Sequence, residues 1–165
     1  MVVDVPGPFD PADLAWTRVS GRLAVARLVV SALWLLPLLV AGTLVAAVGG
    51  EPWLWVGPAV LVALALWVAW LVPRQVRAIG YAERVDDLLI VRGIMFRQLV
   101  VVPYGRMQYV DVSAGPIDRW LGIAKVELHT AAASTQAHIA GLSPTEAGRL
   151  RERLASRGEA RLAGL

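Results

Sequence analysis

The chain contains no cysteine, and this absence excludes disulfide bonds, thiolate metal sites and a cysteine nucleophile. Histidine is almost as scarce, because only His129 and His138 are present and neither belongs to a paired metal-ligand spacing. The sequence motifs of serine hydrolases, zinc proteases and phosphate-binding loops are also missing. We therefore expect no catalytic activity, no cofactor and no bound metal.

Charge is missing from two long stretches of a chain in which 57% of the residues are hydrophobic. Residues 28–48 and 53–72 contain no charged side chain. Each stretch has about the 20 residues that a helix needs to cross a hydrocarbon core of about 30 Å. A buried helix of a soluble protein rarely lacks charge over such a length. The sequence therefore predicts two transmembrane helices.

Only residues 49–52 separate these two spans, so we expect an antiparallel hairpin with both chain termini on one side of the membrane. The turn carries only Glu51, whereas arginines flank the other ends of the spans, namely Arg18, Arg22, Arg27, Arg74 and Arg77. The positive-inside rule then places both termini of a multi-pass protein in the cytoplasm. The net charge of +3 reflects this topology, and no nucleic-acid partner is expected.

The first 27 residues are expected to form a cytoplasmic segment. A cleaved signal peptide is not expected, because acidic residues and not a short basic region precede the first span. Asp10, Pro11 and Asp13 resemble a helix start, and they predict a short helix that runs to Leu23 along the membrane interface.

Small residues recur four positions apart within the spans, as Gly42/Ala46, Ala59/Ala63 and Ala65/Ala69. Such pairs allow two helices to approach closely. Alanine and glycine are also common in apolar helices of any kind. Both interpretations fit the sequence.

After the second span, short segments rich in Val, Ile, Leu and Tyr alternate with turn residues. The predicted strands lie within residues 79–85, 88–93, 94–103, 107–115, 123–131 and 136–141. Short turns between successive strands favour an antiparallel meander that closes into a sandwich or barrel. The capping box Ser143-Pro144-Thr145-Glu146 then starts a helix with Ala147, Leu150 and Leu154 on one apolar face.

Four segments of the second half carry a resemblance to a known family. They are Pro103 with Arg106, Gln108 and Asp111, the turn 119–122, the strand end 129–131 and the lead 141–142 into the helix. With the hairpin, these segments resemble the bacterial membrane-flanked pleckstrin-homology-like (PH-like) family of YdbS-like proteins. The resemblance covers about residues 20–157. It implies an α+β membrane protein in the bacterial inner membrane, in which a two-helix hairpin precedes a seven-stranded PH-like barrel capped by a C-terminal helix.

The resemblance sets the expected domains and partners. The hairpin comprises residues 28–72, the cytoplasmic PH-like domain residues 73–157, and a tail residues 158–165. The chain is similar to family members that are encoded beside a larger membrane protein with several copies of the same domain. This implies a complex with such a protein or self-association, and no catalytic activity is attached to the fold.

The polar and aromatic stretch 102–122 supplies the candidate interaction residues, which are Tyr104, Arg106, Gln108, Tyr109, Asp111, Arg119 and Trp120. Tyr104, Tyr109 and Trp120 are the first candidates for an exposed aromatic surface. Arg106 and Asp111 are also candidates for a structural ion pair in a turn-rich segment. A scaffold that engages another membrane protein is the leading functional hypothesis.

The alternative function is a lipid-sensing or envelope-stress module that contacts anionic lipid through basic residues of the last helix. The candidates for lipid contact are Arg149, Arg151 and Arg153. A specific phosphoinositide site is not expected, because the turn Val85-Asp86-Asp87, identified as the loop between the first two strands of the domain, is acidic.

Overall fold

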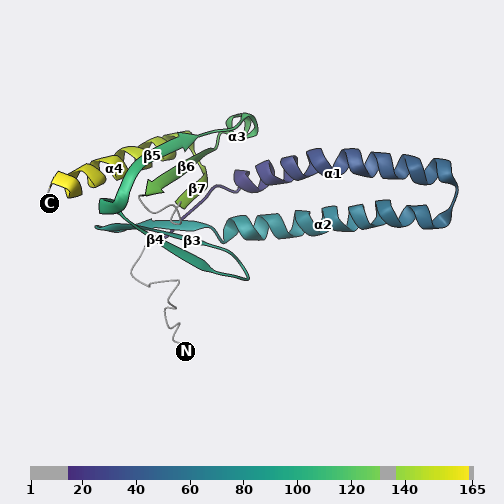
Figure 1. The fold of residues 1–165 in the computed structure, drawn as a ribbon, viewed down its shortest axis with the longest axis horizontal. Coiled ribbons are helices and arrows are strands. Elements are labelled where there is room, and N and C mark those ends of the chain that lie inside the picture. The colour runs from purple at the N-terminus through teal and green to yellow at the C-terminus, as the bar shows by residue number, and fades with distance from the viewer. Residues whose placement is uncertain (1–14, 131–136, 164–165) are drawn as a thin grey trace, which may run out of the picture. The chain divides into compact units, whose positions relative to one another are not determined.

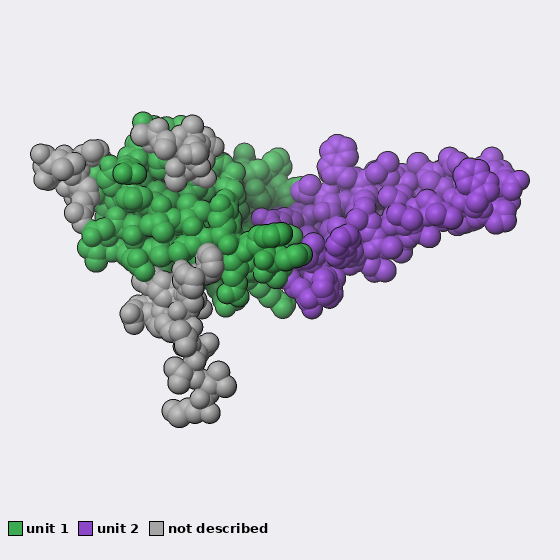
Figure 2. Space-filling view, turned by 60° about the horizontal axis from the view of Figure 1, so that its bottom comes forward, with its two compact units in different colours: residues 1–23, 75–165 green, residues 24–74 purple. Residues whose placement is uncertain are grey.

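A computed structural model describes residues 15–130 and 137–163 of the chain, and these form two compact units (Figure 2). The hairpin unit comprises residues 24–74. The second unit, here called the β unit, takes its described residues from 15–23, 75–130 and 137–163. The chain therefore enters and leaves the hairpin unit from the β unit.

The hairpin unit consists of two long apolar helices joined by a tight turn. Helix α1 spans Arg22–Gly49, the short 3-10 helix η1 spans Pro52–Trp55, and helix α2 spans Val56–Arg77. By length and composition, both helices are able to cross a membrane. The small residues of α1 lie at the helix contact, because Ala46 is buried and a Cβ atom at Gly42 would touch the Pro58 ring at 3.5 Å. Ala59, Ala63 and Ala69 of α2 are exposed, so close packing does not explain their spacing.

Sheet A is antiparallel, with the strand order β1-β2-β3-β4 (Figure 1). Its strands are β1 (Thr17–Arg18), β2 (Gly80–Glu83), β3 (Asp87–Arg92) and β4 (Gln98–Pro103). The predicted helix before the first span is wrong where the structure describes it, because Thr17 and Arg18 pair with Tyr81 and Gly80 of β2. Its proposed start, Asp10 to Asp13, lies outside the described residues. The hairpin is thus inserted in the sequence between the first two strands of sheet A.

Sheet B is antiparallel, with the strand order β5-β6-β7. The 3-10 helix η2 (Tyr104–Arg106) leads from β4 into β5 (Met107–Ser113), and helix α3 (Pro116–Leu121) joins β5 to β6 (Ala124–Thr130). Strand β7 (Ala137–Leu142) is followed by helix α4 (Pro144–Ala163). The structure thus combines two long apolar helices, two antiparallel sheets and a C-terminal helix.

Three predicted boundaries need correction. The strand expected from residue 94 begins at Gln98, because Gly93 has φ +99° and starts a turn over residues 93–97. The turn expected at 119–122 is the end of α3, where Gly122 takes the left-handed conformation. The expected tail is helical as far as Ala163, because α4 continues past residue 157.

The core of the β unit lies between the sheets and under α4. Alternate residues of β6 are buried, and the apolar stripe Ala147, Leu150 and Leu154 of α4 is 0–1% exposed. Burying a leucine side chain contributes about 1.5–3 kcal/mol, so this stripe holds α4 on the sheets. The predicted capping box is confirmed in one half, since the Glu146 amide donates to Ser143 Oγ at 3.2 Å. The Glu146 carboxylate binds Tyr81 and Arg149.

A hydrogen bond from the segment between β1 and α1 connects sheet A to sheet B at one end of the β unit. The Ser20 amide donates to the Gly141 carbonyl of β7 at 2.9 Å. Arg18 of β1 donates through Nη1 to the carbonyl of Arg77, the last residue of α2, at 3.0 Å. A cation at this carbonyl also favours the negative end of the helix dipole. The residues that flank the hairpin are therefore structural parts of the β unit.

Candidate functional site

Tyr104 stands where the chain passes from sheet A to sheet B, and its side chain is fully buried. Its hydroxyl donates to the Arg84 carbonyl at 3.1 Å and accepts from Arg157 Nη1 at 2.8 Å. The Arg157 guanidinium lies 5.2 Å from the centroid of the Tyr104 ring. Burial raises the pKa of Tyr104, and the bond from Arg157 opposes this rise. The expectation that Tyr104 contributes to an exposed aromatic surface is therefore wrong.

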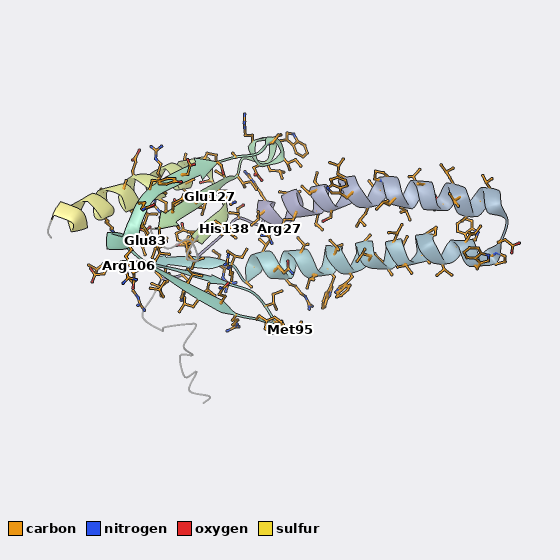
Figure 3. All side chains as sticks on the ribbon, in the orientation of Figure 1. Arg27, Glu83, Met95, Arg106, Glu127 and His138 are labelled. Carbon is orange, nitrogen blue, oxygen red and sulfur yellow. The ribbon has the colours of Figure 1, made fainter. Side chains whose placement is uncertain are left out.

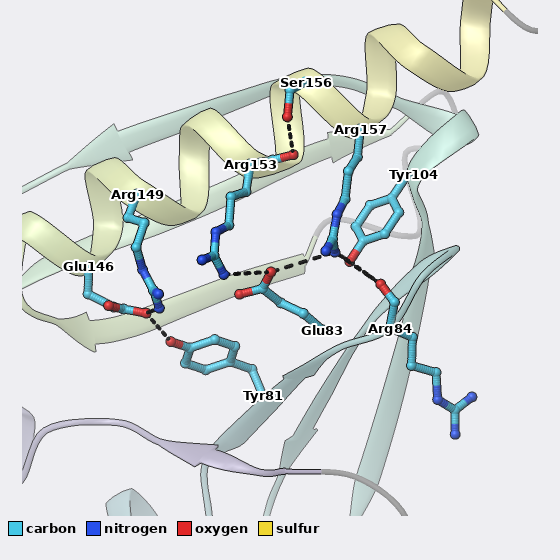
Figure 4. A network of polar contacts seen from close by, with 9 residues as sticks. All are labelled: Tyr81, Glu83, Arg84, Tyr104, Glu146, Arg149, Arg153, Ser156 and Arg157. Atoms are coloured by element: carbon cyan, nitrogen blue, oxygen red, sulfur yellow. Dashed lines mark hydrogen bonds and ion pairs between the residues drawn. The ribbon is translucent and has the colours of Figure 1, made fainter.

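Polar contacts join α4 to β2 along the same side of the helix (Figure 4). The Tyr81 hydroxyl donates to Glu146 Oε1 at 3.0 Å, and Glu83 Oε2 lies 3.6 Å from Arg153 Nη1 and 3.6 Å from Arg157 Nη1. Tyr81 and Glu83 project from the same face of β2 because they are two residues apart. These contacts fix α4 against sheet A, and Tyr104 belongs to the same network.

The three arginines predicted to contact lipid differ in the carboxylates that they contact. Arg149 forms an ion pair with Glu146, and this pair lowers the pKa of the Glu146 carboxyl. Arg153 faces Glu83. Arg151 is exposed and reaches only Glu152, at 4.0 Å. Two of the three positive charges are thus already balanced by carboxylates of the protein.

The predicted ion pair between Arg106 and Asp111 is not formed. Both side chains are exposed, and no contact joins them within the described part of the chain. Asp111 Oδ1 accepts from the Val112 amide at 3.1 Å. Gln108 is exposed at an irregularity of β5 between Met107 and Tyr109, where the register with β6 shifts.

The outer face of sheet B presents an aromatic pair of an exposed tyrosine and a half-buried histidine. Tyr109 is 56% exposed and stacks on His129 of β6, with ring centroids 4.2 Å apart and planes 13° apart. Glu127 forms an ion pair with Lys125, which lowers the pKa of the Glu127 carboxyl. Among the described residues, no group of three His, Cys, Asp or Glu side chains is able to hold a metal ion. Sequence reasoning missed His129, because only the strand register places it opposite Tyr109.

Helix α3 carries the last two predicted residues. Trp120 is 78% exposed, whereas Arg119 Nε donates to the Ala114 carbonyl at 3.2 Å. Arg22, the first residue of α1, donates through Nη1 to the Leu121 carbonyl at 3.3 Å. Trp120 therefore lies beside the point where the chain leaves the β unit for the hairpin.

The predicted acidic turn Val85-Asp86-Asp87 lies where β2 passes into β3, and it does not join the first two strands of sheet A. An open hollow at this turn is lined by Glu83, Arg84, Val85, Asp86, Asp87 and Arg157. The connection between the first two strands is the apolar hairpin. The acidity of this turn is thus no argument against a lipid site at the opposite end of sheet A.

Comparison with known proteins gives one finding. The family model described as Bacterial PH domain matches residues 18–158, from β1 into α4, with the hairpin inside the match. No curated protein and no solved structure matches the chain. Because the family model covers both sheets, the hairpin and the capping helix, this chain belongs to the bacterial PH domain family.

Proposed function

We propose that this protein is a non-enzymatic scaffold in the bacterial inner membrane. In this proposal the hairpin unit anchors the chain, and the β unit lies in the cytoplasm. There it binds a partner, either a larger membrane protein with several PH-like domains or a further copy of this chain. The family match supports the fold of the β unit.

The exposure of the two apolar helices is the observation that supports a membrane anchor. The most apolar 18-residue windows of α1 and α2 are 0% and 6% buried. Leu33, Trp34, Leu38 and Leu66 are each more than half exposed. At about 25 cal/mol per Å², leaving such side chains in water is costly, and a soluble protein rarely exposes so large an apolar surface. A lipid environment removes this cost.

The partner surface that we favour is the edge of sheet A at β4. Among the described strands, β4 pairs only with β3, and it carries the apolar run Leu99–Val102. Val101 is 40% exposed. An apolar edge strand offers unpaired backbone groups to a strand of another chain. Tyr109, which is exposed and stacks on the half-buried His129, provides a second contact surface for the same partner.

The test is the size of the complex extracted from native membranes in mild detergent. Wild-type protein and the control Val85→Lys are expected to migrate above the monomer mass on native electrophoresis, because Val85 is 81% exposed in the β2–β3 turn, outside the run Leu99–Val102 of β4. Val101→Lys should shift the protein towards the monomer, since it places a charge in the contact. Wild-type protein that stays monomeric would contradict the scaffold. A Val101→Lys complex of unchanged size would exclude the β4 edge.

A further inference from the structure

Two exposed apolar groups lie at the end of the β unit from which the hairpin departs. The first is the β3–β4 turn, where Ile94, Met95 and Phe96 are 44%, 85% and 87% exposed (Figure 3 labels Met95). The second is Trp120 on α3, which is 78% exposed. Isolated exposed apolar residues are common, but three consecutive ones at a turn require an explanation.

The strand register fixes the position of the β3–β4 turn. Gly80, which starts β2 three residues after α2 ends, pairs with Arg18 of β1 and with Val91 of β3. Residues 93–97 continue past Val91 and therefore lie at the same end of sheet A as the start of β2. Gly93 makes this turn possible, because it has φ +99° and a Cβ atom would overlap the Phe96 carbonyl.

A separate contact fixes the position of α3. The Arg22 guanidinium binds the Leu121 carbonyl, and Arg22 begins α1. The turn and α3 thus flank the two points, near residues 23 and 75, at which the chain passes between the units.

The length of the helices indicates what surrounds this end of the β unit. The 28 residues of α1 extend about 42 Å, which exceeds the hydrocarbon core of about 30 Å and matches the core plus both headgroup layers. Arg22 then falls in a headgroup layer. Apolar groups at the level of Arg22 meet the boundary between headgroups and acyl chains, where Trp and Phe are favoured.

The charges at this end suit an anionic lipid surface. Six arginines belong to the segments at this end of the β unit, with Asp118 of α3 as an acidic neighbour, and they are Arg18, Arg22, Arg77, Arg92, Arg97 and Arg119. The opposite end of sheet A carries Glu83, Asp86 and Asp87 beside Arg84 and Arg157, so its charges are mixed. A basic residue near an anionic leaflet is attracted to it, and this attraction falls off within a Debye length.

From these observations we propose that the β unit docks on the anionic cytoplasmic headgroup layer through Ile94, Met95, Phe96 and Trp120. We call these four residues the docking surface. This proposal rests on the membrane anchor proposed above. It fixes the β unit on the bilayer surface, in addition to the tether that the hairpin provides.

The absence of cysteine allows a direct test with the full chain. Single-cysteine variants Met95→Cys and Trp120→Cys carry a nitroxide spin label in vesicles of phosphatidylcholine and phosphatidylglycerol. Val85→Cys is the matched control, because Val85 is an equally exposed apolar residue in the turn at the opposite end of sheet A. Leu38→Cys, in the middle of α1 and 57% exposed, reports on the anchor.

The measured quantity is the ratio of label collisions with oxygen to collisions with a water-soluble nickel complex. We expect the ratio at residues 95 and 120 to be severalfold higher than at residue 85, and the ratio at residue 38 to be high. Values at 95 and 120 equal to that at 85, with a high value at 38, would overturn the docking surface and leave the anchor intact. A low value at 38 would overturn the anchor and the docking surface together.

Discussion

At the scale of single residues, Gly141 shows how one backbone conformation closes the β unit. Its φ of +83° lies in the region that favours glycine. Its carbonyl accepts from the Ser20 amide, and a Cβ atom at this position would lie 2.8 Å from Leu23 Cβ. Both the conformation and the close approach require a residue without a side chain. The contact between β7 and the start of α1 therefore depends on this glycine.

Gly141→Ala is expected to destabilise the β unit by at least about 1–2 kcal/mol, because alanine disfavours a positive φ and would collide with Leu23. Gly148→Ala is the control. Gly148 lies inside α4 with nothing within 4 Å of a Cβ atom, so this change should stabilise by up to about 1 kcal/mol. Hydrogen–deuterium exchange of β3 amides, measured on the full chain in detergent, compares the variants. Equal protection in both would contradict the role of Gly141.

Tyr104 shows why residue type alone is a poor guide to function. An aromatic residue with a hydroxyl, placed between two turns, fits an exposed interaction site and a buried structural site equally well. Only the fold brings two groups to its hydroxyl. They are the carbonyl of Arg84, in the turn before β3, and the guanidinium of Arg157, in α4. Tyr109 and Trp120 lie in the same polar and aromatic stretch 102–122, yet they are exposed.

At the scale of elements, α4 is held by two kinds of contact on adjacent sides. The apolar stripe packs on the sheets, and the polar side binds Tyr81, Glu83 and the Arg84 carbonyl. Arg149 and Arg153 are about half exposed and each faces a carboxylate of the β unit, whereas Arg151 reaches only Glu152, at 4.0 Å. The lipid-sensing alternative remains a prediction for Arg149, Arg151 and Arg153, which are all exposed.

The Glu146 carboxylate makes the stability that α4 contributes to the fold depend on pH. Its pKa is lowered below the ordinary value of 4.5, first by the bond from Arg149. A carboxyl whose pKa is lower in the folded state contributes stability above pH 4.5, and this contribution is lost as the pH falls through the folded-state pKa. Glu146→Gln should therefore cost about 0.3–1 kcal/mol at pH 7, and the difference from wild type should disappear in acid.

Thermal unfolding of the full chain in detergent, followed by circular dichroism between pH 7 and pH 3, measures this difference. Glu152→Gln is the control on the same helix, because the Glu152 side chain is 77% exposed and only 4.0 Å from its partner. The control should match wild type at every pH. A Glu146→Gln difference that persists at pH 3 would show that charge is not the cause.

At the scale of the whole molecule, the insertion of an apolar hairpin between β1 and β2 couples the anchor to the fold. The strand before the hairpin and the strand after it pair with each other. In a membrane, the two ends of the hairpin must therefore lie on the same side of the bilayer. The arginines at these ends predict that this side is the cytoplasm.

Thiol labelling in spheroplasts tests this topology. Glu51→Cys, in the turn of the hairpin, should react with a membrane-impermeant maleimide in intact spheroplasts. Val85→Cys, in the β unit, should react only after the membrane is permeabilised. The opposite pattern would place the β unit outside the cytoplasm, and labelling of both sites in intact spheroplasts would contradict a membrane-spanning hairpin.

Much of the fold could be predicted from local patterns. Long runs without charge indicated both apolar helices, alternation and turn residues indicated most strands, and the capping box at Ser143 located the start of α4. The strand β1 could not be predicted in this way. It has two residues, and its pairing partner lies more than 60 positions away, beyond the hairpin.

The candidate site was far less predictable than the fold. Exposure of Tyr109 and Trp120, burial of Tyr104 and the lack of a bond between Arg106 and Asp111 follow from which strands meet, and no local signal carries that information. The sequence by itself determined the two apolar helices, the β-rich region and the final amphipathic helix, because periodicity and charge act over neighbouring residues. Only the tertiary structure decided which polar and aromatic side chains face solvent, because burial depends on contacts between residues far apart in the chain.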